Sequence, residues 1–199
     1  MTQYGIFFDM NRCYACQACS IACKDWHGIE PGAEKWMTVY EWESGTFPNI
    51  RLHSLAFPCA HCEDPACVKA CESGALYKED EFGAVLVDQD KCTGCRKCYD
   101  ACPYGAPKFA TDEPTCKMSK CDMCIDRVSA GLKPMCVKTC PTGAMVFGER
   151  AEVLEEANAR LAKAKERFPK ARLVDAEEVS VIYLLAEEPK FYHEFASFG

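Results

Sequence analysis

Short apolar runs separated by polar turns extend along most of this chain. Residues 4–9 form one such run, and residues 75–78 and 84–88 form two more, joined through the polar turn at 79–83. Short apolar runs bounded by turn residues are typical of β-strands, so the pattern predicts a strand followed later by a hairpin. A last short strand is predicted at residues 145–147.

The segment from residue 24 to residue 58 interrupts this pattern. It contains two strand-like runs, residues 37–42 and 50–56. Between them, serine, glycine, proline and asparagine within 44–49 mark a turn. We therefore expect a second hairpin in this insert.

The end of the chain differs from the rest. Residues 151–167 carry apolar side chains at helical spacing, namely Leu154, Ala157, Leu161 and Ala164. Glutamates lie early and basic residues late in this segment, which suits the helix dipole, and Pro169 then ends the helix. Residues 179–185 form a candidate strand, whereas residues 191–198 show no regular pattern.

Composition then changes the picture, because 17 of the 199 residues are cysteine. This density leaves a disulfide scaffold or a metal protein. The opening MTQYGIFFDMNRC has no basic segment and no long apolar run, so it does not read as a secretion signal. We therefore expect cysteines in a reducing compartment, where metal binding is their usual role.

Two further exclusions follow from charge and hydropathy. The net charge of −7 disfavours nucleic acid as a partner, since phosphate binding favours a basic face. No segment approaches the roughly 18 to 20 apolar residues of a spanning helix, so direct membrane insertion is not expected. The expected location is the cytoplasm, or export in folded form with a partner that bears a twin-arginine signal.

Sixteen of the cysteines fall into four groups of four. Groups one and three share the spacing C-x2-C-x2-C-x3-C, group two has C-x2-C-x4-C-x3-C, and group four has C-x2-C-x11-C-x3-C. In order, the groups are Cys13, Cys16, Cys19 and Cys23; Cys59, Cys62, Cys67 and Cys71; Cys92, Cys95, Cys98 and Cys102; and Cys121, Cys124, Cys136 and Cys140.

These spacings indicate 4Fe–4S clusters. Three closely spaced thiolates converge on one cluster, and the C-x3-C step carries the fourth cysteine to the start of a helix, where it ligates a neighbouring cluster. Zinc also accepts four cysteines, but usually as distant C-x2-C pairs. Because residues 59–102 contain few large aliphatic side chains, we expect loss of iron to unfold the protein.

With these groups in this order, the chain resembles the iron–sulfur subunits of the dimethyl sulfoxide reductase family of molybdenum enzymes. The resemblance covers roughly residues 3–149 and rests on QYGIFFDMNRC, HCEDPAC, CTGCRKCYDACPYGAP, and KCDMC with KPMCVKTCPTGA. It implies an α+β fold of two joined bacterial-ferredoxin-like subdomains, with short strands, cluster-binding loops and a C-terminal helix.

The resemblance also implies the ligands, because in that family group one exchanges a cysteine with group four, and group two with group three. The implied sets are cluster A, Cys13, Cys16, Cys19 and Cys140; cluster B, Cys23, Cys121, Cys124 and Cys136; cluster C, Cys59, Cys62, Cys67 and Cys102; and cluster D, Cys71, Cys92, Cys95 and Cys98. Some relatives have tryptophan in group three and a three-iron cluster, but residue 95 is cysteine here, so four 4Fe–4S clusters are expected.

The same resemblance predicts how the chain is divided. It predicts a four-cluster domain at residues 1–149 and a C-terminal helix with a docking tail at residues 150–199. Within the first domain the predicted parts are subdomain A at about 1–30 plus 103–149, an insert at 31–54, and subdomain B at about 55–102.

The family implies an electron-transfer subunit without a catalytic site of its own, in a heterodimer that serves anaerobic respiration. The partners would be a large catalytic subunit with a bis-pterin molybdenum or tungsten cofactor, and a quinone-linked membrane anchor or a soluble carrier. SGTFPN resembles the polysulfide, arsenate and aromatic-hydroxyl branches, whereas HCEDPAC and CPYGAP resemble the sulfoxide branch. Two alternatives are a polyferredoxin serving a hydrogenase, formate or carbon monoxide system, and a zinc-stabilised scaffold.

Some residues beyond the four groups have more than one interpretation. Cys116 is a bystander thiol, a substitute for Cys121 or a redox-sensitive surface thiol. His61 lies between two cysteines of group two, and a hydrogen-bonding or solvent-facing side chain is favoured over a ligand.

The remaining candidates are basic or aromatic. Three basic residues flank group three, namely Lys91, Arg96 and Lys97. They either raise the reduction potential of its cluster or form a solvated face. The three tryptophans, Trp26, Trp36 and Trp42, are interpreted as packing residues or as a subunit contact. The three other histidines receive no role: His27, His53 and His193.

Overall fold

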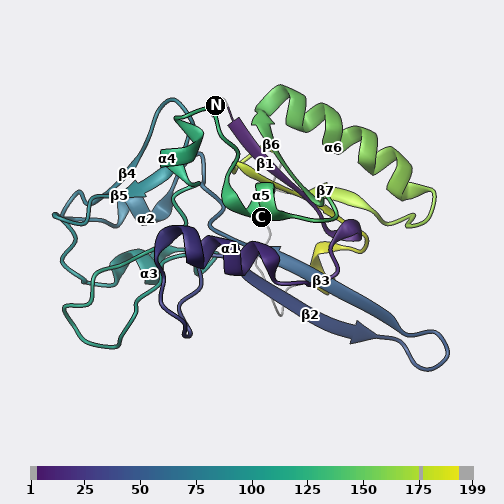
Figure 1. Ribbon diagram of the computed structural model, residues 1–199, viewed down its shortest axis with the longest axis horizontal. Helices are drawn as coiled ribbons and strands as arrows, with labels where there is room; N and C mark the ends of the chain where they lie inside the picture. Colours follow the sequence, from purple (N-terminus) through teal and green to yellow (C-terminus); the bar gives the residue numbers. More distant parts are fainter. Residues whose placement is uncertain (1–3, 175–176, 193–199) are drawn as a thin grey trace.

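The computed structural model describes residues 4–174 and 177–192. Its largest sheet has four strands in the order β6-β1-β8-β7. These strands are β1 (Tyr4–Asp9), β6 (Met145–Glu149), β7 (Arg172–Val174) and β8 (Val181–Leu185). Strand β1 pairs antiparallel with β6 and parallel with β8, so the two ends of the chain meet in the middle of one sheet (Figure 1).

Alternating side chains of this sheet enter two cores. Phe7 faces helix α6 (Arg150–Lys165), together with Ile182 and Leu184 of β8. The neighbouring residues Ile6 and Phe8 face the opposite side. Since successive side chains of a strand point to opposite faces, a strand buried on both faces reads as a continuous apolar run, which is the pattern of β8.

Two separate hairpins complete the strands. Strands β2 (Thr38–Ser44) and β3 (Arg51–Phe57) form a long antiparallel arm, whose turn lies at the lower right of Figure 1. Strands β4 (Leu76–Lys78) and β5 (Val85–Val87) form a short hairpin at the other end of the molecule. All six strand runs predicted before residue 150 are thereby confirmed, as is the strand within 179–185.

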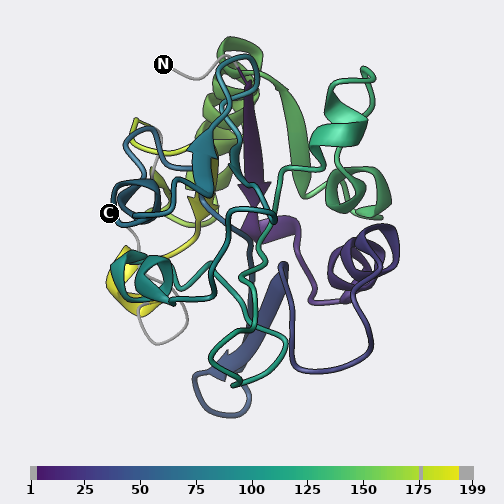
Figure 2. The same cartoon turned by 90° about the vertical axis from the view of Figure 1, so that its left-hand side faces the viewer.

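The helices other than α6 are short, and each contains or adjoins cysteines of one group. The longest is α1 (Ala18–His27), which contains the last two cysteines of group one. The other elements are α2 (Ala66–Lys69), α3 (Lys97–Ala101), α4 (Ile125–Val128), α5 (Met135–Thr139) and the 3-10 turns η1 (Met10–Arg12) and η2 (Pro189–Phe191). Figure 2 shows the dark purple α1 and the green α4 and α5 on one side of the molecule, and the blue α2 and teal α3 on the other.

The prediction that each fourth cysteine begins a helix is wrong. Cys102 and Cys140 are the residues at which α3 and α5 end, Cys71 follows α2, and Cys23 lies inside α1. The helix starts instead at or just before the third cysteine of the group. Four residues of helix rise by about 6 Å, so the third and fourth thiols lie one turn apart and can serve different clusters.

The part of the chain after residue 149, which contains no cysteine, contributes two strands to the main sheet. Strand β7, which no sequence pattern indicated, pairs with β8 at the edge of the main sheet. Helix α6 is confirmed, although it ends at Lys165, four residues before Pro169. Residues 193–199, the end of the predicted docking tail with His193, lie outside the described residues. In the described part of the chain, no helix has the length and apolar character needed to cross a membrane.

Candidate metal centres

The four cysteine groups share one backbone device. In each group the residue before the second cysteine has a positive φ angle, between 48° and 73°. These residues are Ala15, His61, Gly94 and Met123. Only one of them is glycine, although a side chain in this left-handed region costs about 1–2 kcal/mol. Such strain persists where the surrounding structure requires it, and here it turns the C-x2-C segment into a tight loop.

The loop of group one meets the end of group four. Burial, with the thiols of Cys13, Cys140 and Cys16, raises the pKa of Cys19 to about 12. The same four cysteines line one surface hollow, with Tyr14 and Pro141 at its rim. The structure therefore brings together four thiols, of which Cys13 and Cys140 lie 127 positions apart in the sequence.

A second set forms beside the first. Burial and the thiol of Cys124 raise the pKa of Cys23 to about 12. Burial and the thiols of Cys124 and Cys23 raise the pKa of Cys136 well above its ordinary value. Burial raises the pKa of Cys121 well above its ordinary value, and the thiol of Cys23 adds to that shift.

Thiols of groups two and three come together in the same manner. Burial and the thiols of Cys59, Cys102 and Cys67 raise the pKa of Cys62 to about 12. A separate hollow is lined by the remaining four cysteines of these groups, Cys71, Cys92, Cys95 and Cys98. Burial and three neighbouring thiols also raise the pKa of Cys98 to about 11.

These raised pKa values test whether the residues fit a metal cluster. In each set, thiols that are mostly buried or partly buried disfavour one another's ionisation, so they need a nearby cation before all four can become thiolates. Iron supplies that positive charge, and iron–sulfur clusters are bound in proteins by sets of cysteine thiolates. The donor set therefore fits iron–sulfur clusters, and it lacks the distant cysteine pairs of a zinc site.

Hydrogen bonds support two of the thiols in matching ways. The N–H of Leu76 donates to Cys71 Sγ at 3.4 Å, and Ser73 Oγ lies 3.6 Å from the same sulfur. Cys140 has the equivalent hydroxyl, Thr142 Oγ1, at 3.6 Å. Burial opposes ionisation of Cys71 and Cys140, but these donors outweigh it and lower the pKa of both thiols.

His61 proves to be buried, so the solvent-facing interpretation is wrong. Its Nδ1 accepts the N–H of Val85 at 3.0 Å, which assigns the ring proton to Nε2. Burial, with the charges of Lys120 and Lys78, holds its pKa well below the usual value, so the ring is neutral. No described residue accepts a hydrogen bond from Nε2, and a sulfur-rich group in the loop between Cys59 and Cys62 offers acceptors of the kind this N–H needs.

Lys120 is a buried cation that the sequence patterns did not single out. It is 2% exposed, and its ammonium donates hydrogen bonds to the backbone carbonyls of Val85 and Cys121. Its positive charge reaches the thiols of both Cys67 and Cys121. A buried lysine is rare unless it is satisfied in this way, so its position between two cysteine sets is informative.

The three basic side chains that flank group three interact with other side chains. Lys91 pairs with Asp88, Lys97 pairs with Glu72, and the guanidinium of Arg96 lies over the ring of Phe109. Their charges are therefore partly neutralised, which weakens the tuning interpretation.

The odd cysteine lies apart from the four sets. The thiol of Cys116 approaches the carbonyl of Lys117, and the backbone and hydroxyl of Thr111 lower its pKa. It is partly exposed, and no other thiol is among the groups that shift its pKa. Nothing brings it to Cys121, so the bystander and surface-thiol interpretations fit better than substitution.

The tryptophans serve packing. Trp36 and Trp42 are partly buried against the main core. Trp26 is 43% exposed, donates its N–H to Asp126 Oδ2 and lies under the guanidinium of Arg127.

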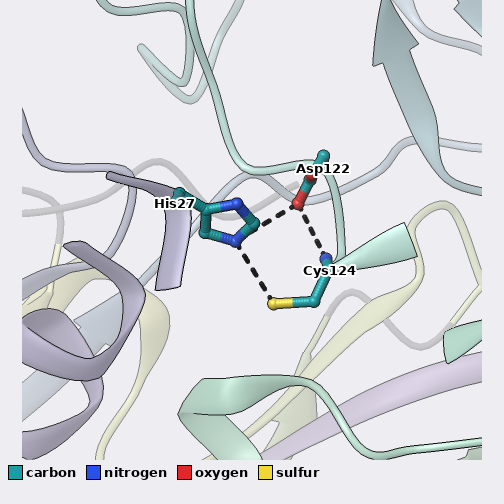
Figure 3. Close-up of side chains that lie close together, drawn as sticks. All are labelled: His27, Asp122 and Cys124. Carbon is teal, nitrogen blue, oxygen red and sulfur yellow. Dashed lines mark hydrogen bonds and ion pairs between the residues drawn. The ribbon is translucent and has the colours of Figure 1, made fainter. Parts of the chain in front are cut away.

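His27, to which the sequence assigned no role, contacts a cysteine of the second set. Its Nε2 lies 3.3 Å from Cys124 Sγ and 3.5 Å from Asp122 Oδ1 (Figure 3). The contact joins residues 97 positions apart, so no local pattern could have indicated it.

Comparison with known proteins agrees with this chemistry. Residues 50–150 match the family described as the 4Fe-4S dicluster domain. The chain is 44% identical to formate dehydrogenase 2 subunit beta (cytochrome c-553) of Nitratidesulfovibrio vulgaris strain Hildenborough, over 98% of each protein. It is 45% identical to the B subunit of the anaerobic dimethyl sulfoxide reductase of Escherichia coli K12, over 74% of each protein.

A third relative is the iron–sulfur subunit of the nitrate-inducible formate dehydrogenase of Escherichia coli K12, 37% identical over 93% of this chain and 69% of that one. These likenesses confirm the resemblance seen in the motifs, and they favour neither the polyferredoxin nor the zinc interpretation. The chain therefore belongs to the iron–sulfur electron-transfer subunits of the molybdopterin oxidoreductases, and it carries four 4Fe–4S clusters.

Proposed function

We propose that this chain relays single electrons through four 4Fe–4S clusters between a catalytic subunit of the formate dehydrogenase type and a separate electron carrier. The ligand sets are those that the family resemblance implies: Cys13, Cys16, Cys19 and Cys140 for cluster A; Cys23, Cys121, Cys124 and Cys136 for B; Cys59, Cys62, Cys67 and Cys102 for C; and Cys71, Cys92, Cys95 and Cys98 for D. Their support is the electrostatic contact of the thiols within each set.

The observation that carries the proposal is that thiols of neighbouring sets influence one another's pKa, and that they do so in a single order. Cys136 of set B interacts with Cys19 of set A, and Cys121 of set B interacts with Cys59 of set C. Cys67 of set C interacts with Cys98 of set D. These influences run from A to B, from B to C and from C to D, and they support a path for electrons through the four proposed sets in that order.

The two ends of this path reach the surface. Cys16 of set A and Cys95 of set D are the only exposed cysteines in the described chain. Cysteines of the two inner sets are buried or partly buried. Electrons would therefore enter and leave at A and D, while B and C are shielded from solvent and from unwanted oxidants.

The chain's own residues perform the supporting work. When bound, each cluster takes up and releases one electron at a time. The protein holds the thiolates on strained loops, keeps water from the inner sets, and stabilises the ligand charge with N–H donors such as those of Leu76 and Met135. We assign no catalytic site to this chain.

Coverage favours formate over sulfoxide chemistry in the catalytic partner. The formate dehydrogenase beta subunit of Nitratidesulfovibrio vulgaris matches 98% of the chain, whereas the dimethyl sulfoxide reductase subunit matches 74%. A match over 98% takes in most of residues 150–199, which supply α6, β7 and β8. We propose that the partner holds a bis-pterin molybdenum or tungsten cofactor, as this family implies.

The pairing of groups supports two ferredoxin-like subdomains, one built on groups one and four and the other on groups two and three. The division into a domain at 1–149 and a tail at 150–199 remains a prediction. Because the name of the first relative includes cytochrome c-553, a c-type cytochrome is the carrier to test first, against a quinone-linked membrane anchor as the second candidate.

The test is anaerobic purification of the tagged chain together with the proteins bound to it. We expect about sixteen irons and sixteen labile sulfides per chain. We also expect a large partner containing molybdenum or tungsten. Formate should bleach the iron–sulfur absorbance of this complex, and oxidised cytochrome c should restore it.

Three results would contradict the proposal. The first is a complex with full iron content but no molybdenum or tungsten. The second is a complex that dimethyl sulfoxide oxidises but formate does not reduce, which would assign the chain to the sulfoxide branch. The third is an isolated chain that exchanges electrons with a hydrogenase alone, as a polyferredoxin would.

A further inference from the structure

The contact between His27 and Cys124 connects two parts of the chain that carry ligands. His27 is the last residue of α1, the helix that also holds Cys19 and Cys23. Its Nε2 reaches the loop of group four, 3.3 Å from Cys124 Sγ (Figure 3). A thiolate bound to iron can only accept a hydrogen bond, so Nε2 must be the donor in the loaded protein.

The ring is held in this position by its surroundings. The His27 side chain is only 10% exposed, and its ring packs against that of Trp36, 4.6 Å away between centroids. Trp36 is itself fixed, because its N–H donates to Ser119 Oγ at 3.0 Å. Directly after His27 the helix ends at Gly28, whose φ of 61° turns the chain away. The imidazole therefore has little freedom to leave Cys124.

A carboxylate competes for the same N–H. Asp122 Oδ1 lies 3.5 Å from His27 Nε2 and accepts the backbone N–H of Cys124 at 2.8 Å. Asp122 thus adds negative charge beside the thiolate and draws the imidazole proton away from sulfur. Cys124 Sγ has one further N–H donor, from Met135 at 3.5 Å. The balance between His27 and Asp122 sets how strongly the sulfur is stabilised.

These three side chains could instead hold a separate metal ion, since their ligand atoms lie within 4.8 Å of one another. Cys124 is already required by cluster B, which would leave that ion only one imidazole and one carboxylate of its own. Structural zinc sites use four ligands. The geometry fits a hydrogen-bond network on a cluster ligand better than a fifth metal centre.

We propose that His27 is a positioning residue that raises the reduction potential of cluster B by donating its Nε2–H to Cys124, and that Asp122 opposes it. The inference rests on the proposed ligand set of cluster B. Reduction by one electron, taken from a neighbouring cluster or from dithionite, adds negative charge to the cluster and its sulfurs. An N–H donor stabilises that charge and therefore favours the reduced form.

The experiment is a redox titration of the purified complex with dithionite, followed by electron paramagnetic resonance. His27→Ala should lower the ratio of reduced to oxidised cluster B at a fixed potential by about tenfold, which is about 59 mV for one electron. His27→Gln keeps an N–H donor and should recover most of that loss. Asp122→Asn should shift the same cluster in the opposite direction.

Two controls separate this effect from a general one. The other three clusters should keep their potentials in each variant. His53→Ala removes a histidine that packs on Trp42 instead, and it should leave cluster B unchanged.

The proposal is overturned if His27→Ala, with full iron content, leaves the potential of cluster B unchanged. It is also overturned if all four potentials move together, or if the variant loses one equivalent of zinc, which would indicate a separate metal site. Low iron in the parent protein as well as in the variants would instead contradict the proposed ligand sets. Iron content and potential are measured on the same samples, so the two failures are distinguishable.

Discussion

Two regions of the molecule carry the same cysteine chemistry on very different supports. The sheet half contains groups one and four, the four-stranded sheet and α6. The hairpin half contains residues 59–102, with the β4–β5 hairpin. In the sheet half, large apolar side chains fill both faces of the sheet, among them Phe7, Phe8 and Ile182 with no exposed surface. The buried cluster around the β4–β5 hairpin has five members, each at most 8% exposed, and two of them are cysteines: Cys67, Leu76, Val85, Cys98 and, from outside residues 59–102, Met118.

The difference indicates that cluster spacing and conventional packing are independent parts of this fold. The left-handed residue before the second cysteine occurs in both halves, so the binding loop does not need a large core beneath it. A segment with little apolar surface to bury must obtain its stability elsewhere, and metal binding can supply it. The hairpin half should therefore depend on its clusters far more than the sheet half does.

The largest expected effect is that of removing iron. Chelation under reducing conditions should unfold residues 59–102, while strands β1, β6 and β8 keep more of their hydrogen-exchange protection. Hydrogen exchange with mass spectrometry, before and after chelation, measures both regions in one sample. Equal loss of protection in both halves, or an apoprotein that stays fully protected, would contradict the comparison.

Removal of one ligand should have the next largest effect. Cys98→Ala in the hairpin half should lose cluster D, about a quarter of the iron, because the thiol is buried within that set. Cys116→Ala is the matched control, since that thiol lies outside every set, and it should keep all the iron. Iron and sulfide analysis of both variants checks the prediction, and equal iron loss would refute it.

Matched leucine substitutions sharpen the comparison. Leu184→Ala in β8 removes a side chain with no exposed surface and should destabilise the sheet half by about 2–5 kcal/mol. Leu76→Ala in β4 should cost less in thermal stability but should speed the loss of cluster absorbance, because Leu76 lines the hollow of set D. Its backbone N–H to Cys71 survives the change. Thermal unfolding and bleaching rates, measured side by side, distinguish the two responses.

The smallest expected effect concerns the boundary between the halves. Lys120→Met removes a buried positive charge near Cys67 and Cys121, and should lower the reduced fraction of clusters B and C by about tenfold at a fixed potential. Lys97→Met removes a cation that is exposed and paired with Glu72, and should change cluster D much less. Redox titration of both variants tests this, and equal shifts would show that burial does not decide the effect.

Local patterns predicted much of the fold correctly. The strand at 4–9, both hairpins and helix α6 lie where hydrophobic periodicity indicated, because a periodic pattern reports directly which side of an element is buried. The short helices beside the cysteines were harder to predict, since each contains ten residues or fewer and none begins at a capping side chain. Three of them, α1, α3 and α4, follow a residue in the left-handed region. Strand β7 has only three residues, too few to show alternation.

The sequence by itself determined that this protein binds iron–sulfur clusters, because the spacing of thiols within 11 residues already restricts which metals they can hold. The grouping of Cys140 with Cys19 came from the family resemblance and not from local spacing. Only the tertiary structure decided that β8 lies beside β1 and that His27 reaches Cys124. The entropy lost on closing a loop changes slowly with loop length, so alternative distant partners differ little in this term. No local pattern selects among them. Packing of the whole chain makes that selection.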